Sequence, residues 1–119
     1  MADDPRNIDF DRIWRVAGAC GLPGLEAGQS HGFPVLKAGG KFLAGCKIAG
    51  SPAFHCPQEE KSLLMEALPH LWFETDHYRG WPAVLLRLDA ASDGDIAEGV
   101  IRAWRANAPA KLKKAYAAR

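Results

Sequence analysis

The segment HYRGW, residues 77–81, places four side chains that can contact a ligand within five consecutive positions. An arginine guanidinium can bind phosphate through two parallel hydrogen bonds, and aromatic rings can stack on nucleobases. The same segment also suits a packed turn, in which the aromatic rings fill the end of a sheet and the arginine pairs with Asp76 or Asp89. We favour the packed turn, because aromatic loops beside strands often pack, although loops also carry function.

Ser30 and His31 are adjacent, as a catalytic hydroxyl and its general base could be. Successive side chains of a strand point to opposite faces of the sheet, so we do not expect these two to act on each other. The same argument applies to Asp76 and His77. No G-x-S-x-G nucleophile elbow occurs in the sequence. The residues therefore predict no catalytic site, and we expect a protein that is not an enzyme.

The three cysteines, Cys20, Cys46 and Cys56, are widely spaced and form no C-x-x-C pair. Cys46, His55 and Cys56 could approach one another across a turn, but zinc sites usually combine closely spaced pairs of ligands. His55 and Cys56 would also point to opposite faces of a strand. We therefore expect three free thiols packed as small hydrophobic side chains, no metal and no cofactor.

The composition is that of one globular domain: 119 residues, 48% hydrophobic and 24% charged. We expect a single domain over residues 1–119. No apolar run approaches the roughly 20 residues that span a membrane, and the acidic N-terminus does not resemble a signal peptide. These features predict a cytoplasmic protein without a membrane partner, and we expect a monomer.

Charge is unevenly distributed along the chain. Residues 1–98 contain nine basic and 14 acidic residues, a net charge of −5, whereas residues 99–119 contain six basic residues and no acid, a net charge of +6. From about residue 110 the chain is therefore a short basic tail. It could contact a negatively charged partner, but such runs are more often simply solvated.

Hydrophobic spacing predicts three long helices with groups of strands between them. The first helix is expected around an apolar stripe that ends at Ala17, with Asn7 or Asp9 as its cap. The second begins at Pro57. The third begins with a capping box at Ser92. Strands are expected at residues 33–37, 41–48, 53–56, 70–75 and 83–88.

This order predicts the fold class α+β, an antiparallel sheet of about five strands with helices packed on one face. A tight hairpin is expected at Gly39 and Gly40. In the strand that follows, strict alternation predicts one face shared by Phe42, Ala44, Cys46 and Ile48. Both Trp14 and Trp104 lie on apolar helix stripes and are expected in the core.

Four motifs resemble the MmcQ/YjbR family: LPG at 22–24, SHGFPVLK at 30–37, the Gly-Lys-Phe start of the next strand, and HYRGWPAVLLRLD at 77–89. The resemblance extends from the first helix through Pro109. It implies a compact CyaY-like α+β domain of bacterial origin that binds DNA, with a double-wing mode of binding. It brings no catalytic residues with it.

Two functional hypotheses follow. The first is DNA binding, weak and electrostatic, with Arg102, Lys111, Lys113 and Lys114 as a basic fringe. The second is a small-molecule or protein-binding domain, with a pocket between the Ser30-His31-Gly32 and His77–Trp81 loops that holds an anionic ligand. A continuous basic stripe would favour the first, and convergence of His31 with Arg79 over a cavity would favour the second. The candidate site residues for DNA or ligand are His31, Lys37, Lys41, Lys47, His77, Tyr78, Arg79, Trp81 and Arg87.

Overall fold

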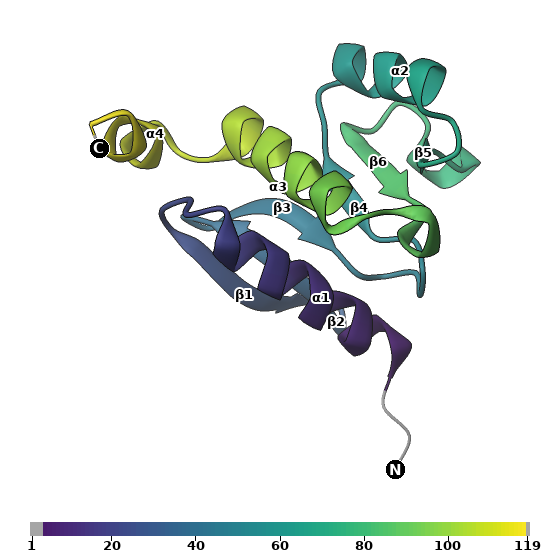
Figure 1. The fold of residues 1–119 in the computed structure, drawn as a ribbon, viewed down its shortest axis with the longest axis horizontal. Helices are drawn as coiled ribbons and strands as arrows, with labels where there is room; N and C mark the ends of the chain where they lie inside the picture. The colour runs from purple at the N-terminus through teal and green to yellow at the C-terminus, as the bar shows by residue number, and fades with distance from the viewer. Residues whose placement is uncertain (1–3, 119) are drawn as a thin grey trace.

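The computed structural model describes residues 4–118, and its elements run α1, four strands, α2, two strands and two further helices (Figure 1). The α-helices are α1 Pro5–Ala19, α2 Gln58–Ala67, α3 Asp93–Asn107 and α4 Ala110–Ala117. The strands are β1 Leu25–Ser30, β2 Phe33–Ala38, β3 Lys41–Gly45, β4 Ala53–His55, β5 Trp72–Phe73 and β6 Ala83–Leu86. Two 3-10 turns, η1 Asp76–Tyr78 and η2 Leu88–Ala90, complete the described chain.

The strands form one antiparallel sheet in the order β1-β2-β3-β4-β6-β5. This confirms the α+β class and the antiparallel sheet. The sheet has six strands where about five were expected, and the strand that was not expected is β1. Its sequence, LEAGQS, has no β-branched or aromatic residue. It is a strand because every one of its residues pairs with β2.

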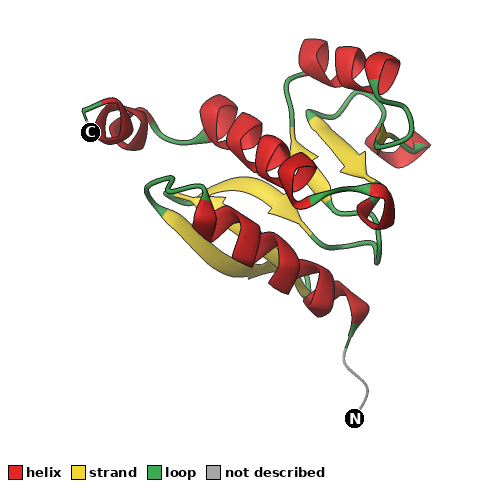
Figure 2. Ribbon diagram, in the orientation of Figure 1, coloured by secondary structure: helices red, strands yellow, loops and turns green. Residues whose placement is uncertain are grey.

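Helices α1 and α3 cover one face of the sheet (Figure 2). The hydrophobic core lies between them and the strands, and partly buried residues of α2 and α4, such as Leu64 and Leu112, pack against the same core. Three buried residues, Val35, Ala53 and Leu85, are outside that core. They point to the opposite side of the sheet, which we call the open face.

A β-bulge in β3 overturns the expected alternation of its side chains. Val35 pairs with Gly45 and Leu36 with Ala44, but the register then shifts, and Lys37 pairs with Phe42. Leu43 is the extra residue, and it is buried in the core beside Ala44. Phe42 therefore lies on the open face and not with Ala44, because an inserted residue reverses the alternation.

Strand directions define two ends of the sheet. The β2–β3 hairpin turns at Gly39 and Gly40, both with positive φ (56° and 81°), and we call this the hairpin end. Because neighbouring strands are antiparallel, β4 and β5 also end there and β6 begins there. The loop of residues 74–82, from β5 to β6, therefore lies at the hairpin end. The β1–β2 turn lies at the opposite end, called the far end.

The first helix begins earlier than expected. Asp4, not Asn7 or Asp9, is its cap and accepts a hydrogen bond from the main-chain N–H of Arg6 (2.9 Å), while Pro5 takes a position where a missing N–H costs nothing. The expected strand 70–75 is reduced to Trp72–Phe73, and the strand 83–88 ends at Leu86 because the chain enters a 3-10 turn. The third helix has the expected capping box, in which the Ser92 and Asp95 side chains each accept a main-chain N–H.

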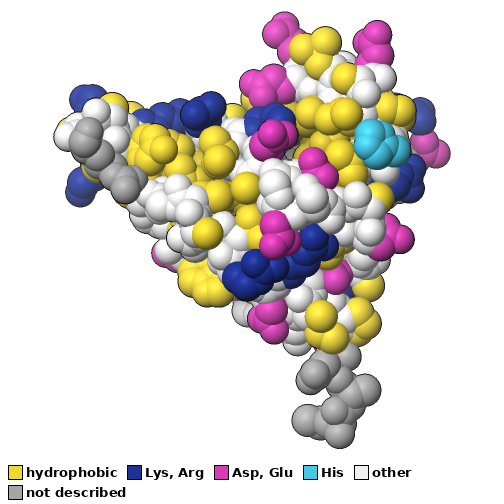
Figure 3. All heavy atoms as spheres, in the orientation of Figure 1, with side chains coloured by type: hydrophobic (Ala, Val, Ile, Leu, Met, Phe, Trp, Pro, Cys, Tyr) yellow, Lys and Arg dark blue, Asp and Glu magenta, His cyan; other side chains and the backbone are white. Residues whose placement is uncertain are grey.

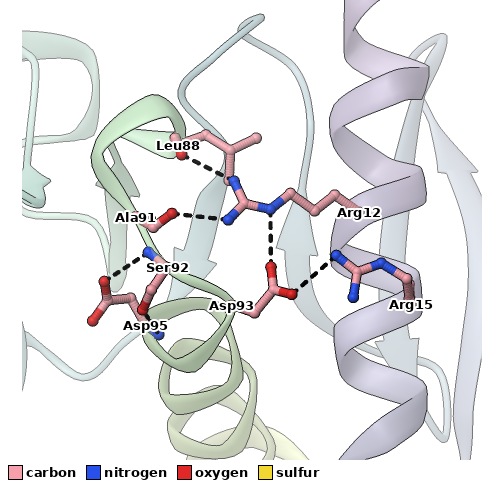
Figure 4. A network of polar contacts seen from close by, with 7 residues as sticks. All are labelled: Arg12, Arg15, Leu88, Ala91, Ser92, Asp93 and Asp95. Carbon is pink, nitrogen blue, oxygen red and sulfur yellow. Dashed lines mark hydrogen bonds and ion pairs between the residues drawn. The ribbon is translucent and has the colours of Figure 1, made fainter.

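Helices α1 and α3 are joined by an arginine network (Figure 4). The guanidinium of Arg12 donates to the carbonyl oxygens of Leu88 (3.1 Å) and Ala91 (2.8 Å) and to Asp93 (3.1 Å). Arg15 lies 3.1 Å from the other oxygen of Asp93. Hydrogen bonds from Arg15 and Arg12 hold the pKa of Asp93 below its usual value.

Of the two tryptophans expected in the core, one is buried. Trp104 is 2% exposed and its indole N–H donates to the carbonyl of Pro23 (3.0 Å). Trp14 is 42% exposed and stacks on Phe10 at a centroid distance of 6.2 Å, so its assignment to the core was wrong. Within residues 4–118, no helix has both the length and the apolar character needed to cross a membrane.

Candidate nucleic-acid interface

The loop of residues 74–82 is fixed from beneath by a buried lysine. Lys61, on α2, is fully buried, and its ammonium donates to the carbonyl oxygens of Tyr78 (2.7 Å) and Trp81 (2.9 Å). The same nitrogen lies 2.9 Å from Oε1 of Glu74. That oxygen accepts no well-directed hydrogen bond among the described residues, so this third contact is mainly a charge pair. The ammonium therefore ties the backbone of the loop to α2 at Tyr78 and at Trp81.

The loop presents its aromatic side chains unequally. Tyr78 is half-buried and contacts the ring of His77 edge-on, at a centroid distance of 5.3 Å. Burial raises the pKa of the Tyr78 hydroxyl. Trp81 is 63% exposed and has no aromatic partner among the described residues. The packed-turn interpretation, in which both rings fill the end of the sheet, was therefore wrong for Trp81.

Arg79 makes the ion pair that the packed turn required. Its guanidinium lies 2.6 Å from Asp76 and, more loosely, 3.8 Å from Glu74. The side chains of Arg79 and Asp76 are 72% and 90% exposed, so water competes for this pair. Surface pairs of this kind contribute about 0–1 kcal/mol, which leaves the guanidinium able to exchange its carboxylate for a phosphate at little cost.

Two further lysines lie at the hairpin end. Lys37 is on the open face, paired in register with Phe42, and Lys41 is exposed beside the hairpin turn. Neither makes an ion pair within residues 4–118. Helix α4 adjoins the same hairpin: a Cβ on Gly39 would lie within 3.2 Å of the Leu112 side chain and 2.8 Å of Pro109. The basic residues of α4 are Lys111, Lys113 and Lys114.

Acidic side chains are scarce in the strands of the sheet. Figure 3 shows acidic side chains on the helix-bearing face, together with Lys and Arg side chains. Glu26 is the one acid in the six strands, and its carboxylate accepts the main-chain N–H of Gly40 at 2.8 Å. We call the lysines of α4, Lys41 and Lys37 the basic stripe, because all lie at the hairpin end, with Glu26 directly opposite Lys37 in the sheet. The acids of the 74–82 loop, Glu74 and Asp76, are each balanced by a contacting cation.

The far end holds the remaining candidate residues, His31, Lys47 and Arg87, which follow β1, β3 and β6 respectively. The pocket expected between the Ser30-His31-Gly32 and His77–Trp81 loops does not form, because the two loops lie at opposite ends of the sheet. They are also next to opposite edge strands. Arg87 lies over the ring of Phe73, 4.1 Å from its centroid, and braces the sheet edge.

The geometry expected for Ser30 and His31 was also wrong. His31 lies in the turn just after β1 and has a positive φ of 49°. Its Nδ1 lies 3.1 Å from the hydroxyl of Ser30. Both side chains stand at the surface turn, and no acid contacts the imidazole among the described residues. The contact is a local hydrogen bond of the turn.

The cysteines are free thiols, and two of them are buried. Burial raises the pKa of Cys46 to about 12 and that of Cys56 to about 11. His55 pairs with Ala83 and lies on the open face, away from Cys56 in the core. Over residues 4–118, no three His, Cys, Asp or Glu side chains are grouped so as to hold a metal ion.

Arg102 does not belong to the basic stripe. It lines a hollow of about 590 Å³ between α2 and α3, on the helix-bearing side. Its guanidinium lies 3.7 Å from Glu60 and 5.8 Å from the ring centroid of Trp72. The fringe proposed from the sequence therefore keeps the three lysines of α4 and loses this arginine.

No family model matches this chain. A stretch of 58 residues, 49% of the chain, is 38% identical to an uncharacterised protein of Mycobacterium bovis. The same stretch is equally similar to uncharacterised proteins of two strains of Mycobacterium tuberculosis. The match covers 45% of the length of each of these relatives. No solved structure matches the chain.

Sequence reasoning did not identify Lys61 as part of the site. It stands among polar residues near the start of α2, where a lysine normally extends into solvent. One signal was present: Lys61 is four residues after Pro57 and three before Leu64, so it lies on the apolar side of that helix.

Proposed function

We propose that this protein binds DNA at the hairpin end of its sheet. The binding is weak and depends on the negative charge of the DNA phosphates. One observation carries the proposal: the strand directions bring Lys37, Lys41, the lysines of α4 and the HYRGW loop to the same end. In the sequence these residues are up to 77 positions apart, from Lys37 to Lys114. Basic residues gathered at one end of a domain are the kind of electrostatic footprint expected of a nucleic-acid-binding surface.

Charge separation supports the proposal. The lysines of the stripe make no ion pair within the described residues, whereas Arg6, Arg12 and Arg15 on α1 are paired with acids. Unpaired cations keep their full charge for phosphate, and neutralising phosphates releases counterions from the nucleic acid. The hairpin turn at Gly39 and the loop at Arg79 both lie at this end, and we propose that they would serve as the two wings that the family resemblance implies.

The small number of lysines determines the DNA affinity that we expect. Non-specific binding of this type has a Kd of about 10⁻⁴–10⁻⁶ M at physiological salt. Fluorescence anisotropy of a labelled DNA, recorded at about 50 and 200 mM salt, measures both the affinity and its salt dependence. We expect binding at the lower concentration and a large loss at the higher one.

A matched pair of variants tests the location. The double variant Lys37→Ala/Lys41→Ala removes two cations of the stripe, and we expect it to weaken binding and to reduce the slope of log K against log salt by about 1 to 2. Lys47→Ala removes an exposed lysine at the far end and should leave binding unchanged. Equal losses in both variants would place the DNA elsewhere or indicate a general charge effect.

A further inference from the structure

Trp81 combines an exposed ring with a fixed backbone. Its indole is 63% exposed. Its main-chain N–H donates to the carbonyl of Tyr78 (3.0 Å), and its own carbonyl accepts from Lys61 (2.9 Å) and from the N–H of Ala83 (2.8 Å). A large apolar ring is thus held in water at a defined position.

Lys61 makes this arrangement costly. Removing an ammonium from water carries a penalty of several kcal/mol, and well-packed hydrophobic residues are often at least as stable as a buried ion pair. A turn that only connected β5 to β6 would not need a buried ammonium. The lysine instead fixes the carbonyls of both Tyr78 and Trp81, so the loop loses little freedom when a ligand binds.

A small cavity lies beside the exposed ring. It has a volume of about 150 Å³ and is lined by His77, Tyr78, Trp81 and Ala83. Three of these four side chains are aromatic, and His77 braces the ring of Tyr78 edge-on. Ala83 lies on the open face, directly across from His55. The cavity therefore opens beside a small side chain and offers flat ring surfaces to a flat ligand.

We infer that Trp81 stacks on an unpaired base of single-stranded DNA, with Tyr78 and His77 lining the place where the base lies. The inference rests on the proposed function, because the lysines of the hairpin end bring the sugar-phosphate backbone to this loop. A paired base in a duplex is already stacked on both faces, whereas an unpaired base has a face available. Stacking on aromatic side chains is tolerant of sequence, so little base preference follows.

Anisotropy titrations of a labelled oligothymidylate and of a duplex of equal length test the inference at low salt. Loss of one stacking interaction should weaken binding of Trp81→Ala to the single strand about five- to hundredfold, with the duplex affinity changed less than about twofold. Trp81→Phe keeps a stacking ring and should retain most of the affinity. Trp14→Ala removes the exposed tryptophan of α1 and is the matched control. Thermal melts of all three variants show whether each is folded.

The outcomes separate the inference from the proposed function. If Trp81→Ala binds the single strand as the unmodified protein does, while Lys37→Ala/Lys41→Ala is weakened, the stacking role is wrong and the electrostatic interface stands. Equal losses for single strand and duplex in Trp81→Ala would likewise contradict stacking on an unpaired base. If the unmodified protein binds neither DNA at low salt, both proposals are wrong.

Discussion

The ammonium of Lys61 lies 2.9 Å from the carbonyl oxygen of Trp81, twenty residues further along the chain. This contact connects a fully buried side chain of α2 to the backbone beneath the exposed ring of Trp81. Stability and presentation of the loop therefore depend on the same charge.

Replacing Lys61 by methionine is expected to destabilise the protein by about 3–5 kcal/mol, because it leaves Glu74 with only its loose contact to Arg79 and removes the ammonium that donates to two carbonyls. Urea unfolding gives the free energy of unfolding. Lys114→Ala, at an exposed position of α4, should change it by less than about 0.5 kcal/mol. A loss for Lys61→Met as small as that control would mean that the ammonium does not hold the loop.

Arg79→Ala is expected to change stability little, by less than about 1 kcal/mol, because its pair with Asp76 is exposed on both sides. If the guanidinium also reaches a phosphate, DNA affinity should fall in the same variant. Melting curves and an anisotropy titration on one preparation give both values. A large drop in melting temperature with unchanged DNA affinity would mean that the role of Arg79 is purely structural.

Cysteine reactivity should follow burial. Cys46 and Cys56 are buried, with pKa values raised to about 12 and about 11, so almost no thiolate forms at pH 8. Cys20 is half-buried and its pKa is raised as well. Mass spectrometry after brief iodoacetamide treatment should find at most one alkylated cysteine, Cys20, in the folded protein and three in urea. Rapid labelling of Cys46 or Cys56 without denaturant would contradict the packing of the core.

The burial of His55 is expected to make the stability of the protein depend on pH. Burial lowers its pKa in the folded protein, so the unfolded chain binds the proton more readily. The free energy of unfolding should therefore be highest above the unfolded pKa of about 6.5 and should decrease as the pH falls from there toward 5. Urea midpoints at these pH values measure the trend. His55→Gln should show a smaller decrease, and an identical decrease in the variant would assign the effect to other groups.

The sequence predicted the features that depend on local chemistry. The capping box at Ser92, the hairpin at Gly39 and Gly40 and the antiparallel α+β class each follow from a short pattern, and each is present. The strand β1 was missed because its residues have little preference for a strand, and pairing with β2 determines its conformation.

The site could be predicted only in part, because long-range pairing decides which loops meet. The basic and aromatic residues of the hairpin end were identified by type, but their separation from His31 follows from strand direction, which the sequence does not state. The bulge at Leu43 places Phe42 on the open face, and no local sequence pattern predicts this bulge. Lys61 was missed because a lysine is normally exposed, and its side chain is buried here only through contacts formed in the tertiary structure.

Amide chemical-shift mapping by NMR tests the central claim most directly. Adding a short single-stranded DNA at low salt to the labelled protein should shift the amides of the β2–β3 hairpin and of residues 76–83. Raising the salt should reverse the shifts, because the contacts are electrostatic. The amides around His31 and Lys47 at the far end and those of α1 should remain in place. Shifts confined to the far end or to the helix-bearing face, or no shifts at low salt, would contradict the account.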